Sequence, residues 1–191
     1  MNIKYFVKLT FFLLLTLCPL MAVNANPSSS LSQILKQSGQ AEQGKMMPFF
    51  SGWTMSNGAG AAYSRTKALK EKRPRYVLNI CASWCEPCME GLEQIAKSKQ
   101  KFLDSNTGLI ILIADKSANA RKLYKRFGFD WAKVIVDEFQ TFAFKLAPDK
   151  KKSGSQDSLS LPRTIIFNTE GKVSKIIGRE GKDYIDQIFA P

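Results

Sequence analysis

Two cysteines three positions apart, Cys85 and Cys88, are the residues of this 191-residue chain best suited to chemistry. A C-x-x-C spacing serves either metal binding or reversible oxidation, because thiolates bind zinc and two nearby thiols can close a disulfide. A structural zinc site takes four ligands, usually cysteines and histidines. The chain has no histidine, and Cys81 is the one further cysteine beyond the N-terminal segment. We therefore expect redox chemistry at Cys85 and Cys88, with no metal and no cofactor other than their disulfide.

The elements around this pair predict how it is positioned. The nearly continuous apolar run Tyr76–Cys81 is typical of a strand buried on both faces, and residues 89–103 carry apolar side chains at helical spacing. Cys85 then stands at a helix start, where N–H groups and the helix dipole favour a thiolate. We expect an exposed, nucleophilic Cys85 and a shielded Cys88 that resolves the mixed disulfide. A static structural disulfide is the alternative.

The rest of the chain alternates strands with helices. A strand, a crossover helix and a second strand require parallel pairing, whereas a hairpin with a turn at 169–171 adds antiparallel strands. The expected fold class is α/β, with a central mixed β-sheet flanked by helices. Strands are expected at 48–55 (an edge strand), 109–114, 134–136, 164–168 and 172–178, and helices at 61–72, 120–127, 139–146 and 183–189.

The cysteine segment resembles a known family. Residues 77–88 (VLNICASWCEPC) are similar to the active-site segment of exported thioredoxin-like proteins of the TlpA/ResA type, which commonly reads N-F-W-A-S-W-C-x-P-C. Residues 160–164 (SLPRT) resemble the second family signature, a cis-proline just before a strand. The resemblance covers about residues 48–189. It implies a thioredoxin-like fold and thiol–disulfide oxidoreductase activity.

The same resemblance implies roles for further residues. Trp84, Glu86 and Pro87 would support the active site. Asn79 stands where thioredoxins proper carry a buried acid that relays protons to the resolving thiol, and asparagine is usual in the TlpA type. In the family, the cis-proline loop lies against the cysteine pair and binds an extended substrate segment. Leu161 and Pro162 occupy the matching positions.

Two features depart from the family pattern. Cys81 replaces the usual tryptophan, and the residues after Cys88 lack the glutamate and second proline of C-x-P-C-x-x-E-x-P. The second departure weakens a direct transfer of a cytochrome c maturation role. Free cysteine packs well in buried strands, so we interpret Cys81 as a buried strand residue. A third redox thiol is the alternative.

The N-terminus has the features of a secretory signal. Lys4 and Lys8 precede an apolar run at 9–23, which is short for a bilayer span of about 20 residues. We expect a bacterial periplasmic or secreted protein, with an uncleaved inner-membrane anchor as the alternative. The expected organisation is a signal peptide at 1–25, an N-terminal extension at 26–45 and a thioredoxin-like domain at 46–191.

The positive net charge of the chain bears on whether nucleic acid or a membrane surface is a partner. The formal net charge is +12, but the basic residues are spread over several segments without an aromatic-interleaved groove or recognition helix. We therefore expect no nucleic-acid partner, and a solvated basic surface that favours anionic membrane headgroups. The expected partners are disulfide-containing client proteins and a membrane thiol–disulfide reductase as electron donor.

Two alternatives to a reductase stay open. The protein could oxidise its clients by donating its own disulfide, because the direction depends on how well the thiolate is stabilised. It could also be a peptide-binding or chaperone module on a thioredoxin fold, although an intact C-x-x-C pair argues against this.

Overall fold

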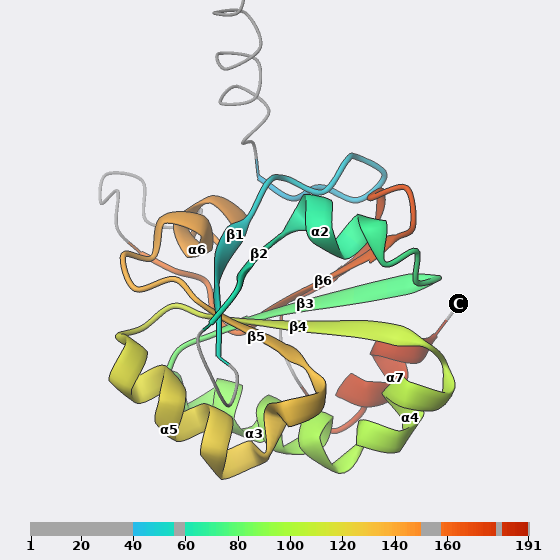
Figure 1. Cartoon of the computed structure of the whole chain (residues 1–191). Helices are drawn as coiled ribbons and strands as arrows, with labels where there is room; N and C mark the ends of the chain where they lie inside the picture. The colour runs from blue at the N-terminus through green and yellow to red at the C-terminus, as the bar shows by residue number, and fades with distance from the viewer. Residues whose placement is uncertain (1–39, 56–59, 150–157, 179–180, 191) are drawn as a thin grey trace, which may run out of the picture. The chain divides into compact units, whose positions relative to one another are not determined.

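A seven-stranded sheet forms the centre of the computed structural model, which describes residues 40–55, 60–149, 158–178 and 181–190. The strand order is β2-β1-β5-β4-β3-β6-β7 (Figure 1). β4 pairs in parallel with β3 and β5, and the other neighbours are antiparallel. The predicted α/β class with a mixed sheet is confirmed. The strands are β1 (Ser51–Thr54), β2 (Ala62–Ser64), β3 (Arg75–Cys81), β4 (Thr107–Ile113), β5 (Lys133–Val136), β6 (Arg163–Asn168) and β7 (Val173–Ile177).

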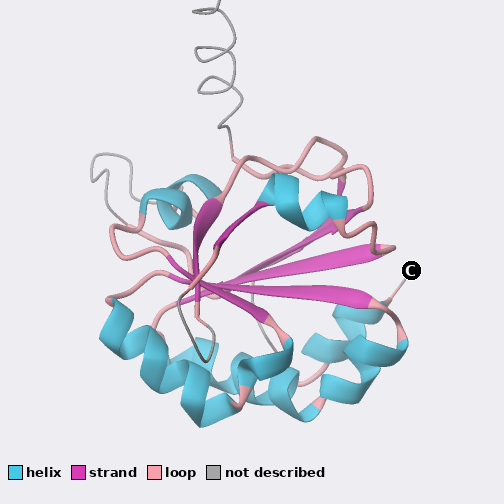
Figure 2. Cartoon of the chain, in the orientation of Figure 1, coloured by secondary structure: helices cyan, strands magenta, loops and turns pink. Residues whose placement is uncertain are grey.

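Helices cover both faces of this sheet. Figures 1 and 2 show α3, α4, α5 and α7 on one face, and α2 and α6 on the other. The order β3–α3–β4 and β4–α5–β5 makes α3 and α5 crossover connections between parallel strands. The helices are α2 (Arg65–Lys70), α3 (Glu86–Lys97), α4 (Lys99–Asp104), α5 (Ser117–Phe127), α6 (Thr141–Leu146) and α7 (Tyr184–Phe189), with a 3-10 turn at Phe129–Trp131.

The register of the central strands brings two distant segments to one end of the sheet. Cys81, the last residue of β3, pairs with Ile113, the last residue of β4. β6 runs in the opposite direction, and its first residue, Arg163, pairs with Ile80. The loop that leads into β6 therefore lies at the same end of the sheet at which the cysteine segment leaves β3.

The strand predicted at 48–55 is not an edge strand. β1 lies between β2 and β5, with Gly52 opposite Tyr63 and Trp53 opposite Val136. The first residues of the helix predicted at 61–72 form β2 instead, because pairing with β1 buries Tyr63 (3% exposed). Ser64 then caps α2 by accepting a hydrogen bond from the Lys67 N–H at 3.3 Å.

The helix predicted at 89–103 begins earlier and is divided. α3 starts at Glu86, directly after Cys85, because Pro87 in the first turn has no N–H that would need an intrahelical partner. It ends at Lys97 and is capped by Ser98, whose N–H donates to the carbonyls of Gln94 and Ile95, and α4 follows. The predicted hairpin at 164–178 is confirmed as β6 and β7.

The predicted signal peptide and most of the predicted extension, residues 26–39, lie outside the described residues. The last part of that extension contacts the sheet: Ala41 is buried, and the Gly44 N–H donates to the Val173 carbonyl at 2.8 Å. Across the described ranges, no helix combines the length and apolar character that a bilayer span requires.

Candidate active site

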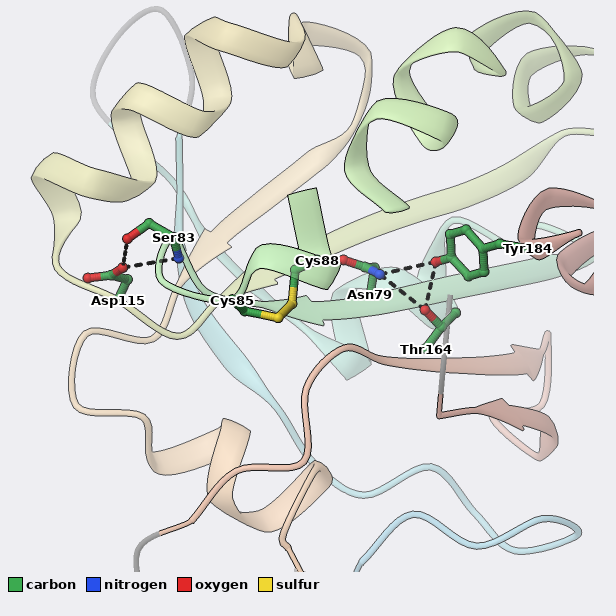
Figure 3. The surroundings of a disulfide bond; sticks show 7 residues. All are labelled: Asn79, Ser83, Cys85, Cys88, Asp115, Thr164 and Tyr184. Atoms are coloured by element: carbon green, nitrogen blue, oxygen red, sulfur yellow. Dashed lines mark hydrogen bonds between the residues drawn. A yellow bond between two sulfur atoms is a disulfide. The ribbon is translucent and has the colours of Figure 1, made fainter. Parts of the chain in front are cut away.

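Cys85 and Cys88 form a disulfide at the start of α3 (Figure 3). Their Cα atoms are 5.3 Å apart, and Cys85 is the N-cap of the helix. The Cys88 N–H donates to the Cys85 carbonyl at 3.0 Å. The positive end of the 12-residue α3 thus lies beside the sulfur pair, where it favours a thiolate once the disulfide is reduced.

The two cysteines differ less in exposure than predicted. Cys88 is fully buried, which confirms its predicted shielding. The prediction that Cys85 is exposed was wrong for the disulfide form, in which only 5% of Cys85 is exposed. Its bond to a fully buried partner holds the Cys85 sulfur against the core. The neighbours predicted to support the site are open to solvent: Trp84 is 59% exposed, and Glu86 and Pro87 are exposed.

Asn79, Thr164 and Tyr184 form a neutral hydrogen-bonded group, here called the Asn79 cluster. The Asn79 Nδ2 donates to Thr164 Oγ1 and to the Tyr184 hydroxyl at 3.1 Å each, and the two hydroxyl oxygens are 2.7 Å apart. All three residues are fully buried. In the view of Figure 3, this cluster lies on the Cys88 side of the disulfide. Sequence reasoning found Asn79 but missed its two partners, which lie 85 and 105 positions later on β6 and α7.

A second group, the Asp115 cluster (Ser83, Asp115 and Asn119), holds the segment that leads to Cys85. Asp115 Oδ2 accepts hydrogen bonds from the Ser83 N–H at 3.2 Å and from the Ser83 hydroxyl (Figure 3). Its Oδ1 accepts from the Lys116 N–H at 2.7 Å and from Asn119 Nδ2 at 2.9 Å. Burial by itself raises the pKa of Asp115, but these hydrogen bonds outweigh burial and hold the pKa below its ordinary value.

Sequence reasoning missed Asp115 altogether. The available signal was an acidic residue just after a buried strand, at the end of the sheet where the cysteine segment also emerges. Asp137 holds the similar place after β5, and its carboxylate accepts the N–H groups of Thr141, Phe142 and Ala143 at 2.8–2.9 Å. Burial raises the pKa of Asp137 more than these hydrogen bonds lower it.

The Leu161–Pro162 peptide bond is cis, as the family resemblance implies. Pro162 is buried, and Leu161 is half-buried against the core. Because Arg163 pairs with Ile80, Pro162 lies level with Cys81 at the end of the sheet that carries the cysteine pair.

Cys81 takes no part in the disulfide. It is fully buried at the end of β3, and its carbonyl accepts the Ala114 N–H at 2.8 Å. This burial favours the interpretation of Cys81 as a strand residue. Within the described ranges, no group of three or more histidine, cysteine, aspartate or glutamate side chains could hold a metal ion.

Comparison with known proteins identifies the family of this chain and two of its relatives. The model of the Redoxin family matches residues 42–184. The chain belongs to the Redoxin family. Among its curated relatives is the thiol-disulfide oxidoreductase ResA of Bacillus subtilis, 24% identical over 101 residues, which are 52% of this chain and 50% of ResA. The thioredoxin-like protein YneN of the same organism is 23% identical over 148 residues, covering 76% of this chain and 78% of YneN. The match to ResA thus spans about half of that protein's length.

The thioredoxin-like fold has solved counterparts. A thiol:disulfide interchange protein of the thioredoxin family from Chlorobium tepidum superposes with a TM-score of 0.55. The match covers 78% of this chain and 95% of that protein, at 20% identity. This likeness shows the thioredoxin-like fold.

Proposed function

We propose that this Redoxin-family protein is an extracytoplasmic thiol–disulfide oxidoreductase that reduces client disulfides through Cys85 and Cys88. The observation that carries the proposal is the Cys85–Cys88 disulfide at the N-terminus of α3, with Cys85 as the N-cap. A helix start stabilises an anionic sulfur, and a C-x-x-C pair in this position is suited to exchange. The names of the relatives ResA and YneN support the same chemistry.

In the first step, the Cys85 thiolate of the reduced protein attacks one sulfur of a client disulfide. The client S–S bond breaks, its other sulfur leaves as a thiolate that takes a proton from solvent, and a Cys85–client mixed disulfide forms. Cys85 is the attacking residue because it retains some exposure, whereas Cys88 has none.

In the second step, Cys88 loses its proton and attacks the Cys85 sulfur. The Cys85–client bond breaks, the client leaves with its second thiol, and the Cys85–Cys88 disulfide forms. Two electrons pass from the protein to the client in each cycle. Cys88 is well placed for this step because it is the third residue of α3, with its Cα 5.3 Å from that of Cys85.

We infer that the client binds as an extended segment along the loop at Leu161 and Pro162. The β3–β6 register puts this loop at the same end of the sheet as the cysteine segment. Proline has no N–H, so pairing would use the neighbouring Leu161 backbone, as in strand addition. The partly buried Leu161 side chain is also available to contact the client.

We also propose that the protein acts outside the cytoplasm and receives its electrons from a membrane reductase. The signal-like segment at 1–25 supports export, and an exported reductase needs electrons from the cytoplasm, which a membrane thiol–disulfide reductase would supply. The exposed basic residues Arg121, Lys122, Lys125 and Arg126 of α5, a helix with no acidic residue, would favour an anionic membrane surface.

Single-cysteine variants test the proposed exchange. Cys85→Ser should abolish dithiol-dependent reduction of a model disulfide. Cys88→Ser should accumulate mixed disulfides at Cys85, because the resolving thiol is missing. Cys81→Ala is the matched control, since Cys81 is buried outside the disulfide, and it should retain reduction within about twofold of wild type. Trapping by Cys85→Ser but not by Cys88→Ser would reverse the assigned roles.

A further inference from the structure

The Asp115 cluster connects two loops at the end of the sheet that carries the cysteine pair. Asp115 follows β4 and precedes α5, whereas Ser83 lies between β3 and α3, two residues before Cys85. Both donor groups of Ser83, its N–H and its hydroxyl, point to the same carboxylate oxygen. The backbone pairing between β3 and β4 extends to the residue before Asp115, because the Ala114 N–H donates to the Cys81 carbonyl at 2.8 Å.

Hydrogen bonds, rather than an ion pair, hold the Asp115 carboxylate as an anion. Asp115 is 8% exposed, and its two oxygens accept four hydrogen bonds. No ion pair to Asp115 is present within the part of the chain that the structure describes. The side chain of Lys116, the next residue, is exposed, as is that of Glu86, the residue after Cys85, so solvent screens both charges more strongly than it screens Asp115.

The charge lies close enough to Cys85 to act on it. Two residues span at most about 7 Å, and Asp115 Oδ2 lies 3.2 Å from the Ser83 nitrogen, so the carboxylate is at most about 10 Å from the Cys85 backbone nitrogen. This separation is of the order of the Debye length at physiological salt, about 8 Å, and the intervening protein screens less than water does. A negative charge at this range disfavours a thiolate and so opposes the effect of the α3 N-terminus.

We propose that Asp115 is a positioning residue for Cys85: its carboxylate fixes the loop of residues 82–84 through Ser83 and places a negative charge at the base of that loop. The inference rests on the proposed exchange function. Fixing the loop aligns the Cys85 sulfur for in-line attack on a disulfide, and small misplacements of a reacting atom slow such steps strongly. The charge keeps the thiolate from being over-stabilised, which preserves its nucleophilicity.

Alkylation of Cys85 as a function of pH tests this inference, with the full chain in a Cys88→Ser background and iodoacetamide as the probe. Asp115→Asn keeps the shape but removes the charge, and it should lower the Cys85 pKa by about half a unit to one unit. Ser83→Ala removes the hydroxyl bond but keeps the charge, and it should leave this pKa unchanged. Asp137→Asn is the matched control, because it changes a buried carboxylate of the next helix start that has no hydrogen bond to Ser83.

The rate of attack on a model disulfide, measured where Cys85 is fully ionised, tests the positioning role. It should fall about tenfold in Asp115→Asn and about threefold in Ser83→Ala, and stay within twofold in Asp137→Asn. An unchanged pKa and rate in Asp115→Asn, or equal effects in Asp137→Asn, would overturn the inference. The pKa measurement does not require exchange activity. A wild-type protein that alkylates normally but attacks no disulfide would therefore contradict the proposed function, whereas the pKa shift would still report on Asp115.

Discussion

The two polar clusters that flank the disulfide differ in charge and in burial. The Asp115 cluster carries an ionised carboxylate and a half-buried serine near the surface, whereas all three residues of the Asn79 cluster are neutral and fully buried. The first is tied to the loop before Cys85, and the second joins β3, β6 and α7. The difference matches the two proposed roles, because the attacking sulfur must meet a client while the resolving sulfur reacts inside the protein.

The largest effect on stability is expected in the Asn79 cluster. Tyr184→Phe removes a fully buried hydroxyl that contacts both Asn79 and Thr164, and it should lower the free energy of unfolding by about 1–3 kcal/mol. Tyr124→Phe, at a half-buried position on α5, is the matched control and should change it by less than about 0.5 kcal/mol. Urea unfolding of the two variants checks the difference. Equal losses would mean that the buried cluster contributes no more than an ordinary tyrosine contact.

The two helix-start carboxylates should respond to acid in opposite directions. The pKa of Asp115 is lowered, so its contribution to stability is fully present above the unfolded value of about 3.9 and is lost as the pH falls through its folded pKa. The pKa of Asp137 is raised, so its contribution is fully present below about 3.9 and is lost as the pH rises through its folded pKa.

Unfolding free energies of Asp115→Asn and Asp137→Asn at several pH values check these signs. The loss caused by Asp115→Asn should be about 1–2 kcal/mol at pH 7 and smaller at pH 3. The loss caused by Asp137→Asn should instead be smaller at pH 7 than at pH 3. If the loss in unfolding free energy changed with pH in the same direction in both variants, the opposite pKa shifts of Asp115 and Asp137 would be contradicted.

The smallest effect on stability is expected at the exposed aromatic residue next to Cys85. Trp84 is 59% exposed, so Trp84→Ala should change the free energy of unfolding by no more than about 0.5 kcal/mol. We expect the rate of mixed-disulfide formation with a client to fall about threefold, because Trp84 adjoins the attacking cysteine. Phe139→Ala, at an 88% exposed position that follows β5 and does not adjoin Cys85 in the sequence, should leave this rate unchanged. Equal rates in the two variants would remove Trp84 from the client-binding surface.

The sequence predicted those parts of the molecule that depend on local pattern. The apolar run of β3, the helix directly after Cys85 and the hairpin of β6 and β7 follow from residue type and spacing, and the structure has all three. The cis bond before Pro162 came from family resemblance, since few X-Pro bonds in folded proteins are cis. Local pattern was therefore sufficient to place the cysteine pair on its helix.

The parts that sequence reasoning missed depend on contacts between distant segments. The local sequence of residues 61–64 is compatible with a helix, but pairing with β1 makes residues 62–64 a strand and buries Tyr63. Asp115, Thr164 and Tyr184 carry no motif, and their roles appear only once the fold brings them beside Ser83 and Asn79. Tertiary pairing, rather than propensity, decided these positions.

The reduction potential of the Cys85–Cys88 couple tests the proposed function most directly. A protein that reduces its clients should have a potential near that of thioredoxin, about −270 mV, when equilibrated with a glutathione or dithiothreitol buffer. A value near about −120 mV, typical of a strong disulfide donor, would contradict the proposed reductase and assign this site to client oxidation.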